Sequence, residues 1–243
     1  MKFTMVLEDS LAEELCSFKN KKECNIKIIE RILYYYKQYV LLRKEYMRRY
    51  YDSETLKSIL GQKTSLEYSD DLECLSKNTI YKIILSEKQY DFPYVNIFED
   101  KIENNFTASF IKNEDRKKAK EHLKALFLNA NHLFVYDKFI NDNQMEFIKF
   151  AEECFPRKKL NIFYPIENGM KFPNNLCTDL KNIYKEWNIV ENKDCVINRK
   201  YNYLHDRYII VDKKIQIILT SGIDNLMDIK KDFTYIIREL QNI

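Results

Sequence analysis

Apolar residues recur at helical spacing through the first quarter of the chain. Between residues 25 and 60 they fall three or four positions apart, with lysine and arginine between them. A period of about 3.6 residues is typical of amphipathic helices. The pattern predicts one long helix or two shorter ones ending near Gly61, preceded by a short strand at residues 2–7 and a helix through Phe18. The polar, irregular segment 62–77 is the expected linker, and residues 79–85 are expected to form a strand after it.

Beyond residue 114 the predicted helices and strands alternate. Helices are expected at residues 114–130, 143–155 and 176–187, and strands at residues 132–140, 159–164, 196–198, 203–211, 215–219 and 233–237. This alternation is typical of an α/β sheet with helices packed on it. We therefore expect a mainly helical N-terminal region, residues 1–77, followed by an α/β domain, residues 78–243.

Composition excludes several classes of site. The chain has 243 residues, of which 45% are hydrophobic and 32% charged, as in folded proteins with a packed core. Its three glycines lie far apart, which excludes the glycine-rich phosphate loops of Walker and Rossmann proteins. Six cysteines without a Cys-x-x-Cys pair and only three histidines predict neither a zinc site nor a disulfide framework, so neither metal nor cofactor is expected.

Charge and hydropathy bear on partners and location. The net charge of +3 does not by itself single out nucleic acid or an anionic membrane as partner. The sequence shows no signal peptide and no transmembrane segment, so we expect a cytoplasmic protein.

One short segment combines residue types that suit phosphate chemistry. Residues 204–212 read Leu-His-Asp-Arg-Tyr-Ile-Ile-Val-Asp. Alternate side chains of an extended strand share a face, so His205 and Arg207 are expected side by side. An imidazole that titrates near neutral pH and a forked guanidinium can contact the same phosphate group. Ser221 and the backbone at Gly222, in the turn after the next predicted strand, can donate further hydrogen bonds to an anion.

The pattern His-x-Arg-x-x-x-x-Asp at His205, Arg207 and Asp212, followed by Ser221 and Gly222, resembles the signature of the phospholipase D superfamily. In that family the pattern is His-x-Lys-x-x-x-x-Asp with a downstream Gly-Ser. The resemblance covers about residues 115–240 and implies a phospholipase D-like mixed sheet flanked by helices. It implies that His205 acts as nucleophile or acid, Arg207 holds the phosphate oxygens, Asp212 orients the site and Ser221 supports the phosphate. The family's catalysis uses two histidines and no metal.

Two departures from the family leave two functions open. Arg207 replaces the family's lysine, and a single copy of the motif is present where catalysis needs two. A symmetric homodimer would supply the second copy, which gives a phosphodiesterase, expected to be a nuclease of a bacterial defence or mobile-element system. The alternative is a non-catalytic module that binds the phosphate of nucleic acid or anionic lipid. The run from His205 with Gly222-Ile223-Asp224 most resembles the non-catalytic phospholipase D-like C-terminal domain of MIT-domain proteins.

Other charged residues have both a functional and a structural interpretation. Asp137 and Lys138, at the end of the strand expected at 132–140, are candidates for the same sheet edge, because ligands of open α/β sheets gather at the carboxyl ends of strands. Ordinary surface charges would look the same. The basic, tyrosine-rich stretch 34–51 fits either a nucleic-acid groove or a solvated helix face. A third reading makes the N-terminal helices an adaptor for a larger defence complex.

Overall fold

The computed structural model describes residues 3–37, 39–60, 70–165, 174–192, 201 and 204–240. The chain divides into two compact units, Met1–Asn105 and Phe106–Ile243. The polar segment 62–77 therefore lies within the first unit, because a strand beyond it pairs with the first strand of the chain and a further strand pairs with that second one.

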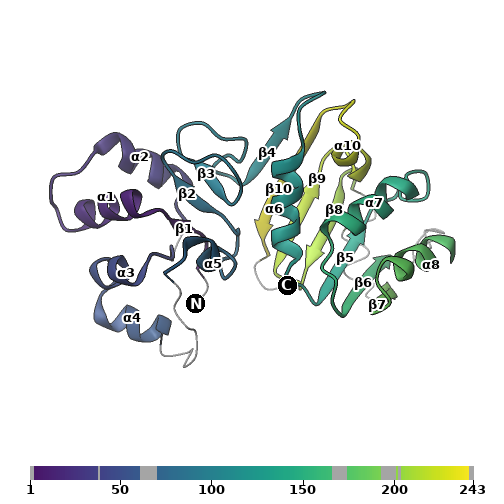
Figure 1. Ribbon diagram of the computed structural model, residues 1–243, viewed down its shortest axis with the longest axis horizontal. Coiled ribbons are helices and arrows are strands. Elements are labelled where there is room, and N and C mark those ends of the chain that lie inside the picture. Colours follow the sequence, from purple (N-terminus) through teal and green to yellow (C-terminus); the bar gives the residue numbers. More distant parts are fainter. Residues whose placement is uncertain are drawn as a thin grey trace. The chain divides into compact units, whose positions relative to one another are not determined.

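Helices dominate the described part of the first unit (Figure 1). They are α1 (Asp9–Lys19), α2 (Ile26–Tyr35), α3 (Lys44–Tyr50), α4 (Ser53–Leu60) and α5 (Leu72–Ser76). The apolar pattern of residues 25–60 thus forms three helices rather than one or two. The expected linker, residues 62–77, contains α5, which begins where the Asp71 carboxylate accepts a hydrogen bond from the Glu73 amide.

Helix α2 shows how the sequence pattern sets local structure. The side chain of Asn25 accepts hydrogen bonds from the amides of Lys27 and Ile28 and so caps the first turn. The side chains of Ile28, Ile29, Ile32 and Tyr35 are buried on one face, as the period of the sequence predicts.

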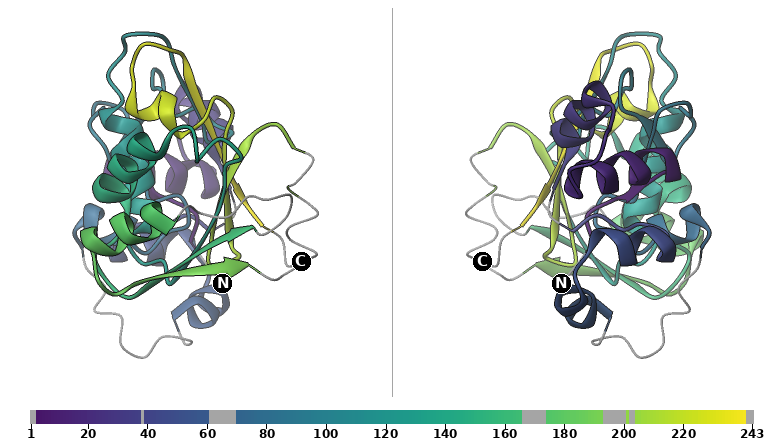
Figure 2. Two further views of the ribbon diagram at one scale, coloured as in Figure 1. Left: turned by 90° about the vertical axis from the view of Figure 1, so that its right-hand side faces the viewer. Right: turned by 90° about the vertical axis from the view of Figure 1, so that its left-hand side faces the viewer.

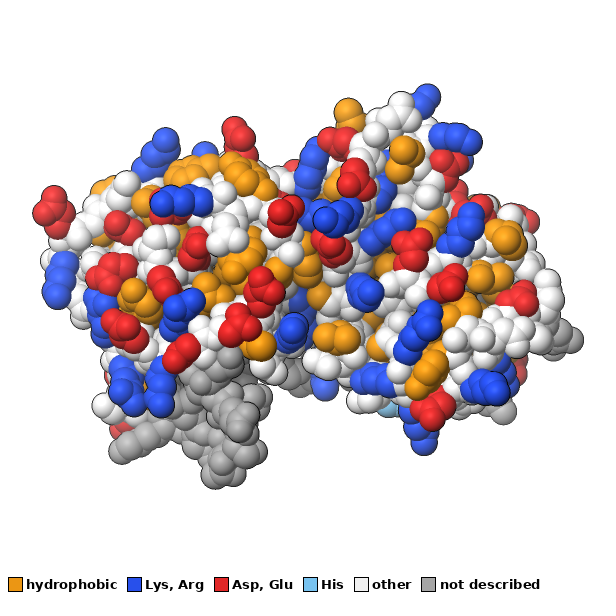
Figure 3. All heavy atoms as spheres, in the orientation of Figure 1, with side chains coloured by type: hydrophobic (Ala, Val, Ile, Leu, Met, Phe, Trp, Pro, Cys, Tyr) orange, Lys and Arg blue, Asp and Glu red, His pale blue; other side chains and the backbone are white. Residues whose placement is uncertain are grey.

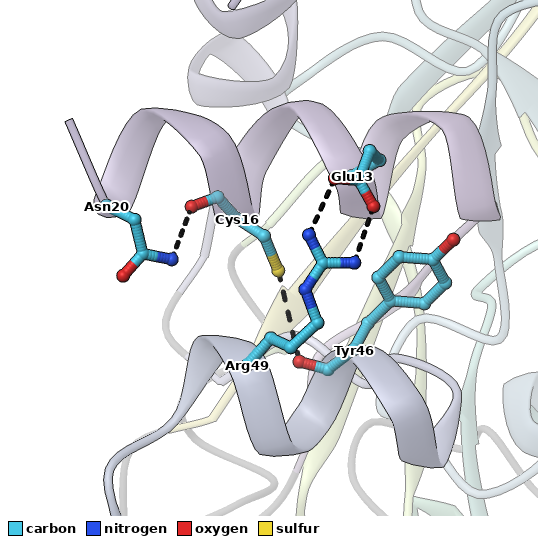
Figure 4. Close-up of polar contacts among 5 residues, drawn as sticks. All are labelled: Glu13, Cys16, Asn20, Tyr46 and Arg49. Atoms are coloured by element: carbon cyan, nitrogen blue, oxygen red, sulfur yellow. Dashed lines mark hydrogen bonds and ion pairs between the residues drawn. The ribbon is translucent and has the colours of Figure 1, made fainter. Parts of the chain in front are cut away.

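Helices α1 and α3 also meet through polar contacts (Figure 4). The Arg49 guanidinium donates two hydrogen bonds of 2.6 Å to the carboxylate of Glu13, and this hydrogen bonding is the main reason that the pKa of Glu13 is lowered. The Cys16 thiol donates to the Tyr46 carbonyl oxygen, and the Asn20 amide donates to the Cys16 carbonyl oxygen. Because the Arg49 pair is exposed, water screens it, and the buried apolar faces of the helices dominate this packing.

The first unit also contains a small parallel sheet in the order β1-β2-β3. Its strands are β1 (Val6–Leu7), β2 (Ile84–Ser86) and β3 (Tyr94–Asn96). The strands expected at residues 2–7 and 79–85 are therefore present but shorter. The N-terminal region is mainly helical, and the pairing of its strands was not predicted.

The second unit is built on a seven-stranded mixed sheet in the order β4-β10-β9-β8-β5-β6-β7. Strands β5, β6 and β7 run parallel, and the other neighbours pair antiparallel. The strands are β4 (Thr107–Phe110), β5 (His132–Tyr136), β6 (Leu160–Pro165), β7 (Trp187–Asn192), β8 (Arg207–Val211), β9 (Ile215–Leu219) and β10 (Phe233–Glu239).

Helices cover one face of this sheet, as Figures 1 and 2 show. They are α6 (Lys117–Phe127), α7 (Gln144–Cys154) and α8 (Asn174–Ile183), with the short α10 (Ile223–Met227) packed against α7. On this side the His122 imidazole of α6 lies 2.8 Å from the Tyr235 hydroxyl of β10. The opposite side carries a cluster of buried residues, Phe134, Tyr136, Tyr201, Tyr208, Ile210 and Ile218. The predicted α/β fold class, a mixed sheet flanked by helices, is confirmed.

The helix expected at 176–187 is shorter than predicted, and the strand expected at 196–198 cannot be compared. The helix expected at 176–187 ends at Ile183, and Trp187 instead begins β7, because its ring packs against Phe155 beneath the sheet. The strand expected at 196–198 lies outside the described residues. Within the described residues no helix is both long and apolar enough to cross a membrane.

Candidate functional site

Two neighbouring strands bring Arg207 and Asp137 together. Strand β8 lies between β5 and β9, and Tyr208 of β8 pairs with Tyr136 of β5. Arg207 is the first residue of β8 and Asp137 directly follows β5, and the two strands run antiparallel. Both residues therefore lie at the same edge of the sheet, the one formed by the strand ends rather than by an outer strand. The Arg207 Nε atom is 3.6 Å from the Asp137 Oδ1 atom, and the two side chains are only 17% and 3% exposed. This is a largely buried ion pair.

The Phe139 ring lies close to two cations, Arg207 and Lys138, at this edge. The Phe139 amide donates a 2.9 Å hydrogen bond to Asp137 Oδ1, which holds the loop after β5 in place. The Arg207 guanidinium carbon lies 4.7 Å from the centre of the Phe139 ring, and the Lys138 ammonium lies 5.2 Å from it. Both distances are within the range of cation–π attraction. Lys138, a residue expected at the sheet edge, therefore shares a ring with Arg207.

The turn after β9 packs directly against Arg207. Gly222 has φ 95° and ψ 163°, a conformation that side-chain-bearing residues rarely adopt. A Cβ atom at Gly222 would lie 3.3 Å from Arg207 Nε and 3.4 Å from its guanidinium carbon. The half-buried Ser221 precedes it in the same turn. The structure thus brings the backbone of Gly222 to Arg207.

A second carboxylate, that of Asp224, affects the ionisation of Asp137 in this cluster. Burial raises the pKa of Asp137 and the charge of Asp224 raises it further, while the Phe139 amide and Arg207 act in the opposite direction. Arg207 Nε and Asp224 Oδ1 are both buried and have no hydrogen-bond partner among the residues that the structure describes. Buried polar atoms in native proteins are nearly always paired, so a group that both accepts from Arg207 Nε and donates to Asp224 Oδ1, such as a hydroxyl, would be stabilised here.

His205 lies at the surface, next to this cluster in sequence. The strand expected from residue 203 begins only at Arg207, so the alternation of side chains that placed His205 and Arg207 on one face does not extend to His205. His205 is exposed whereas Arg207 is mostly buried. The imidazole is therefore accessible to a partner molecule, but no strand geometry fixes its direction.

Asp212 lies at the other end of β8. Its Oδ1 atom accepts hydrogen bonds from the amides of Asn131 (3.0 Å) and His132 (2.8 Å), and the His132 Nδ1 atom is 3.4 Å away. Asp212 is five residues along the chain from Arg207, which corresponds to about 16 Å at ~3.3 Å per extended residue. Asp212 joins the β8–β9 turn to the start of β5, and it is too far from Arg207 to touch the same phosphate.

Sequence reasoning did not single out Phe139 and Asp224. Asp224 carried a weak signal, because it follows the Ser221-Gly222 turn by two residues. Phe139 carried none, since its contact with Arg207 joins residues 68 positions apart.

The basic, tyrosine-rich stretch of the first unit has structural partners. The Tyr35 hydroxyl donates to the Ile102 carbonyl oxygen, the Tyr51 hydroxyl donates to the Val40 carbonyl oxygen, and Arg43 pairs with Asp9. These contacts favour the structural interpretation over a nucleic-acid groove. On the face shown in Figure 3, blue and red side chains are interspersed and form no single basic patch. Among the described residues no three His, Cys, Asp or Glu side chains form a group that could hold a metal ion.

Comparisons with known proteins give only a weak structural likeness. No protein-family model matches the chain, and no curated protein sequence matches it. Among solved structures the chain is similar to NucT from Helicobacter pylori, with 13% sequence identity and a TM-score of 0.30, over 55% of this chain and 84% of that one.

Proposed function

We propose that the unit Phe106–Ile243 is a phospholipase D-like module that binds a phosphate diester at the edge formed by His205, Arg207 and Lys138. One observation carries the proposal: the Ser221-Gly222 turn lies against the Arg207 guanidinium, two residues beyond the exposed His205. The sequence motif predicts that this turn lies next to the Arg207 guanidinium.

The charges around Arg207 favour binding over unaided cleavage. Asp137 is paired with Arg207, and Asp224 lies close enough to raise the pKa of Asp137. A guanidinium already opposed by carboxylates stabilises the added charge of a transition state less than a free one does. The described part of the chain also offers one exposed motif histidine, whereas the family's mechanism divides nucleophile and acid between two.

Binding is tested with fluorescent single-stranded RNA and DNA and, separately, with vesicles containing an anionic phospholipid. We expect His205→Ala and Lys138→Ala to weaken binding of whichever probe is recognised. For a nucleic acid, Lys138→Ala would also lower the slope of log affinity against log salt by about 1, because one phosphate contact is lost. The matched control is Lys214→Ala, an exposed lysine at the opposite end of the β8–β9 pair. Equal losses in all three variants, or no binding of any probe, would contradict the proposal.

A second function is supported by the exposure of His205. An exposed imidazole at the edge of one copy can meet its symmetry mate in a homodimer, which would give the two histidines of a metal-independent phosphodiesterase. Such an enzyme would serve as a nuclease of a bacterial defence or mobile-element system. Native mass measurement and nuclease assays in EDTA test it. A strict monomer, or cleavage that His205→Ala leaves unchanged, would exclude it.

A further inference from the structure

A cavity of about 400 Å³ opens on the second unit's sheet, away from the Arg207 cluster. Its walls include Phe134, Phe163 and Ile210, and its polar groups include His132, Asp212 and Lys213. Most of its lining is apolar with a few polar groups, which is the usual make-up of small-molecule sites, and its size falls within their range of roughly 300–1,000 Å³.

The register of the sheet explains how these residues meet. Phe134 of β5 pairs with Phe163 of β6 on one side and with Ile210 of β8 on the other. Paired residues point to the same face of a sheet, so these three side chains form one floor. Phe134 and Ile210 belong to the cluster on the face opposite the helices. Arg207 is an odd number of residues from Ile210 along β8 and so points to the helix side.

The rim carries an aromatic platform that is already stacked. The His132 and Phe163 rings are 5.9 Å apart between centres and inclined by only 26°. The His132 side chain is about half exposed, at 53%. Two nearly parallel rings beside an open cavity present a flat surface on which a third planar ring can lie.

The Asp212 carboxylate and the backbone of the turn at the rim are held in fixed positions. Asp212 is anchored by the amides of Asn131 and His132. Asp212 and Lys213 have φ of 48° and 56°, and the Lys214 amide donates to the Val211 carbonyl oxygen, which closes a tight turn between β8 and β9. The turn places a carboxylate and an ammonium together at the mouth of the cavity.

We propose that this cavity binds a nucleobase. The base would stack on the His132–Phe163 platform, its amino edge would donate to the Asp212 carboxylate, and a phosphate attached to its sugar would lie by Lys213. The base can come from a free nucleotide or from a single strand of nucleic acid. The inference does not depend on the proposed function, because the cavity and Arg207 lie on opposite faces of the sheet.

The experiment measures binding by calorimetry for the 5′-monophosphates of adenosine, guanosine, cytidine and uridine, for ribose 5-phosphate, and for a single-stranded oligonucleotide of about 12 nucleotides. The variant Phe163→Leu removes the ring but keeps an apolar side chain at a half-buried position, so the fold is retained. Lys213→Asn removes the ammonium and suits the left-handed backbone there, because asparagine tolerates positive φ. Lys214→Asn, at an exposed neighbour that does not line the cavity, is its matched control.

We expect Phe163→Leu to weaken binding of at least one base-containing probe by about tenfold, as loss of a stacking partner does. Lys213→Asn should weaken it by a smaller factor that shrinks at high salt, and Lys214→Asn should leave it unchanged. Binding of monophosphates identifies a free-nucleotide site, and binding of the oligonucleotide alone identifies a single-strand site. No binding of any base-containing probe, equal binding of ribose 5-phosphate, or indifference to Phe163→Leu would overturn the proposal.

Discussion

Replacing Gly222 by alanine should strain the candidate site directly. The backbone there, at φ 95° and ψ 163°, costs a residue with a side chain about 1–3 kcal/mol. The added Cβ would also overlap Asp224 Oδ1 and stand 3.3 Å from Arg207 Nε. The overlap forces the buried carboxylate to move, and the short distance to Arg207 forces the guanidinium to shift by a few tenths of an ångström. We expect Gly222→Ala to lower the free energy of unfolding by about 2–4 kcal/mol.

The chain has a built-in reporter for this measurement. Its one tryptophan, Trp187, is buried in the second unit, so its fluorescence follows the unfolding of that unit in urea. With a slope of ~2 kcal/mol per molar urea, the expected loss moves the midpoint by about 1–2 M. Ser221→Ala is the control, because it changes the preceding residue of the same turn. A loss below about 0.5 kcal/mol in Gly222→Ala would refute the strained geometry of the turn.

Three further changes test separate contacts. Burial raises the pKa of Asp137 above its ordinary value of 3.8, so this carboxyl holds a proton more tightly in the folded protein. We therefore expect the stability of the wild type relative to Asp137→Asn to fall as pH rises from about 4 through the raised pKa. Urea unfolding at several pH values measures this difference, and a difference that stays constant with pH would contradict the expectation. Asp212→Ala leaves the two amides at the start of β5 without their acceptor, so the free energy of unfolding in urea should fall by about 1–2 kcal/mol. An unchanged urea midpoint would mean that the carboxylate does not stabilise the turn. Arg116 is 2% exposed and donates to three backbone carbonyl oxygens, so Arg116→Met should cost about 2 kcal/mol or more by the same assay, and a neutral result would show that water replaces those donors.

Local patterns predicted the elements whose own sequence decides them. Helix α7 and strand β9 appear within a residue or two of their predicted bounds, because one buried face sets the period of each. Trp187 was assigned to a helix, since large apolar residues fit either structure and only the contact with Phe155 decides for β7. The small sheet of the first unit was missed because its strands β1 and β2 pair across 78 residues of sequence, and no local pattern carries that information.

The candidate site divides in the same way. The meeting of Arg207 with the Ser221-Gly222 turn could be predicted, because β8 and β9 are adjacent antiparallel strands and Arg207 pairs with Leu219, just before that turn. The distance to Asp212 follows from the length of β8 alone. By contrast, the enclosure of Arg207 by Asp137 and Phe139 depends on where β5 enters the sheet, which the sequence pattern does not specify.

The charge balance around Arg207 leads to one more expectation. Near neutral pH the cluster holds the cations Arg207 and Lys138 and the carboxylates Asp137 and Asp224, so a phosphate meets little net attraction from it unless a proton is added. Asp137 is the carboxyl most ready to take that proton, because its pKa is already raised by burial and by Asp224. An anion beside Arg207 would weaken the guanidinium's pull on Asp137 and raise that pKa further. Binding of a phosphate diester should therefore take up a proton.

By linkage, affinity for the phosphate should then rise as pH falls toward the pKa of Asp137 in the complex. Calorimetry in two buffers of different ionisation enthalpy measures the proton uptake, and it is repeated on Asp137→Asn and on His205→Ala, a change at the exposed neighbouring residue. Uptake that persists in His205→Ala and disappears in Asp137→Asn would assign the proton to the buried carboxyl. Uptake that disappears only in His205→Ala would place the anion at the imidazole and leave Arg207 as a structural partner of Asp137. Binding without any proton uptake would mean that the anion does not reach the charges of this cluster.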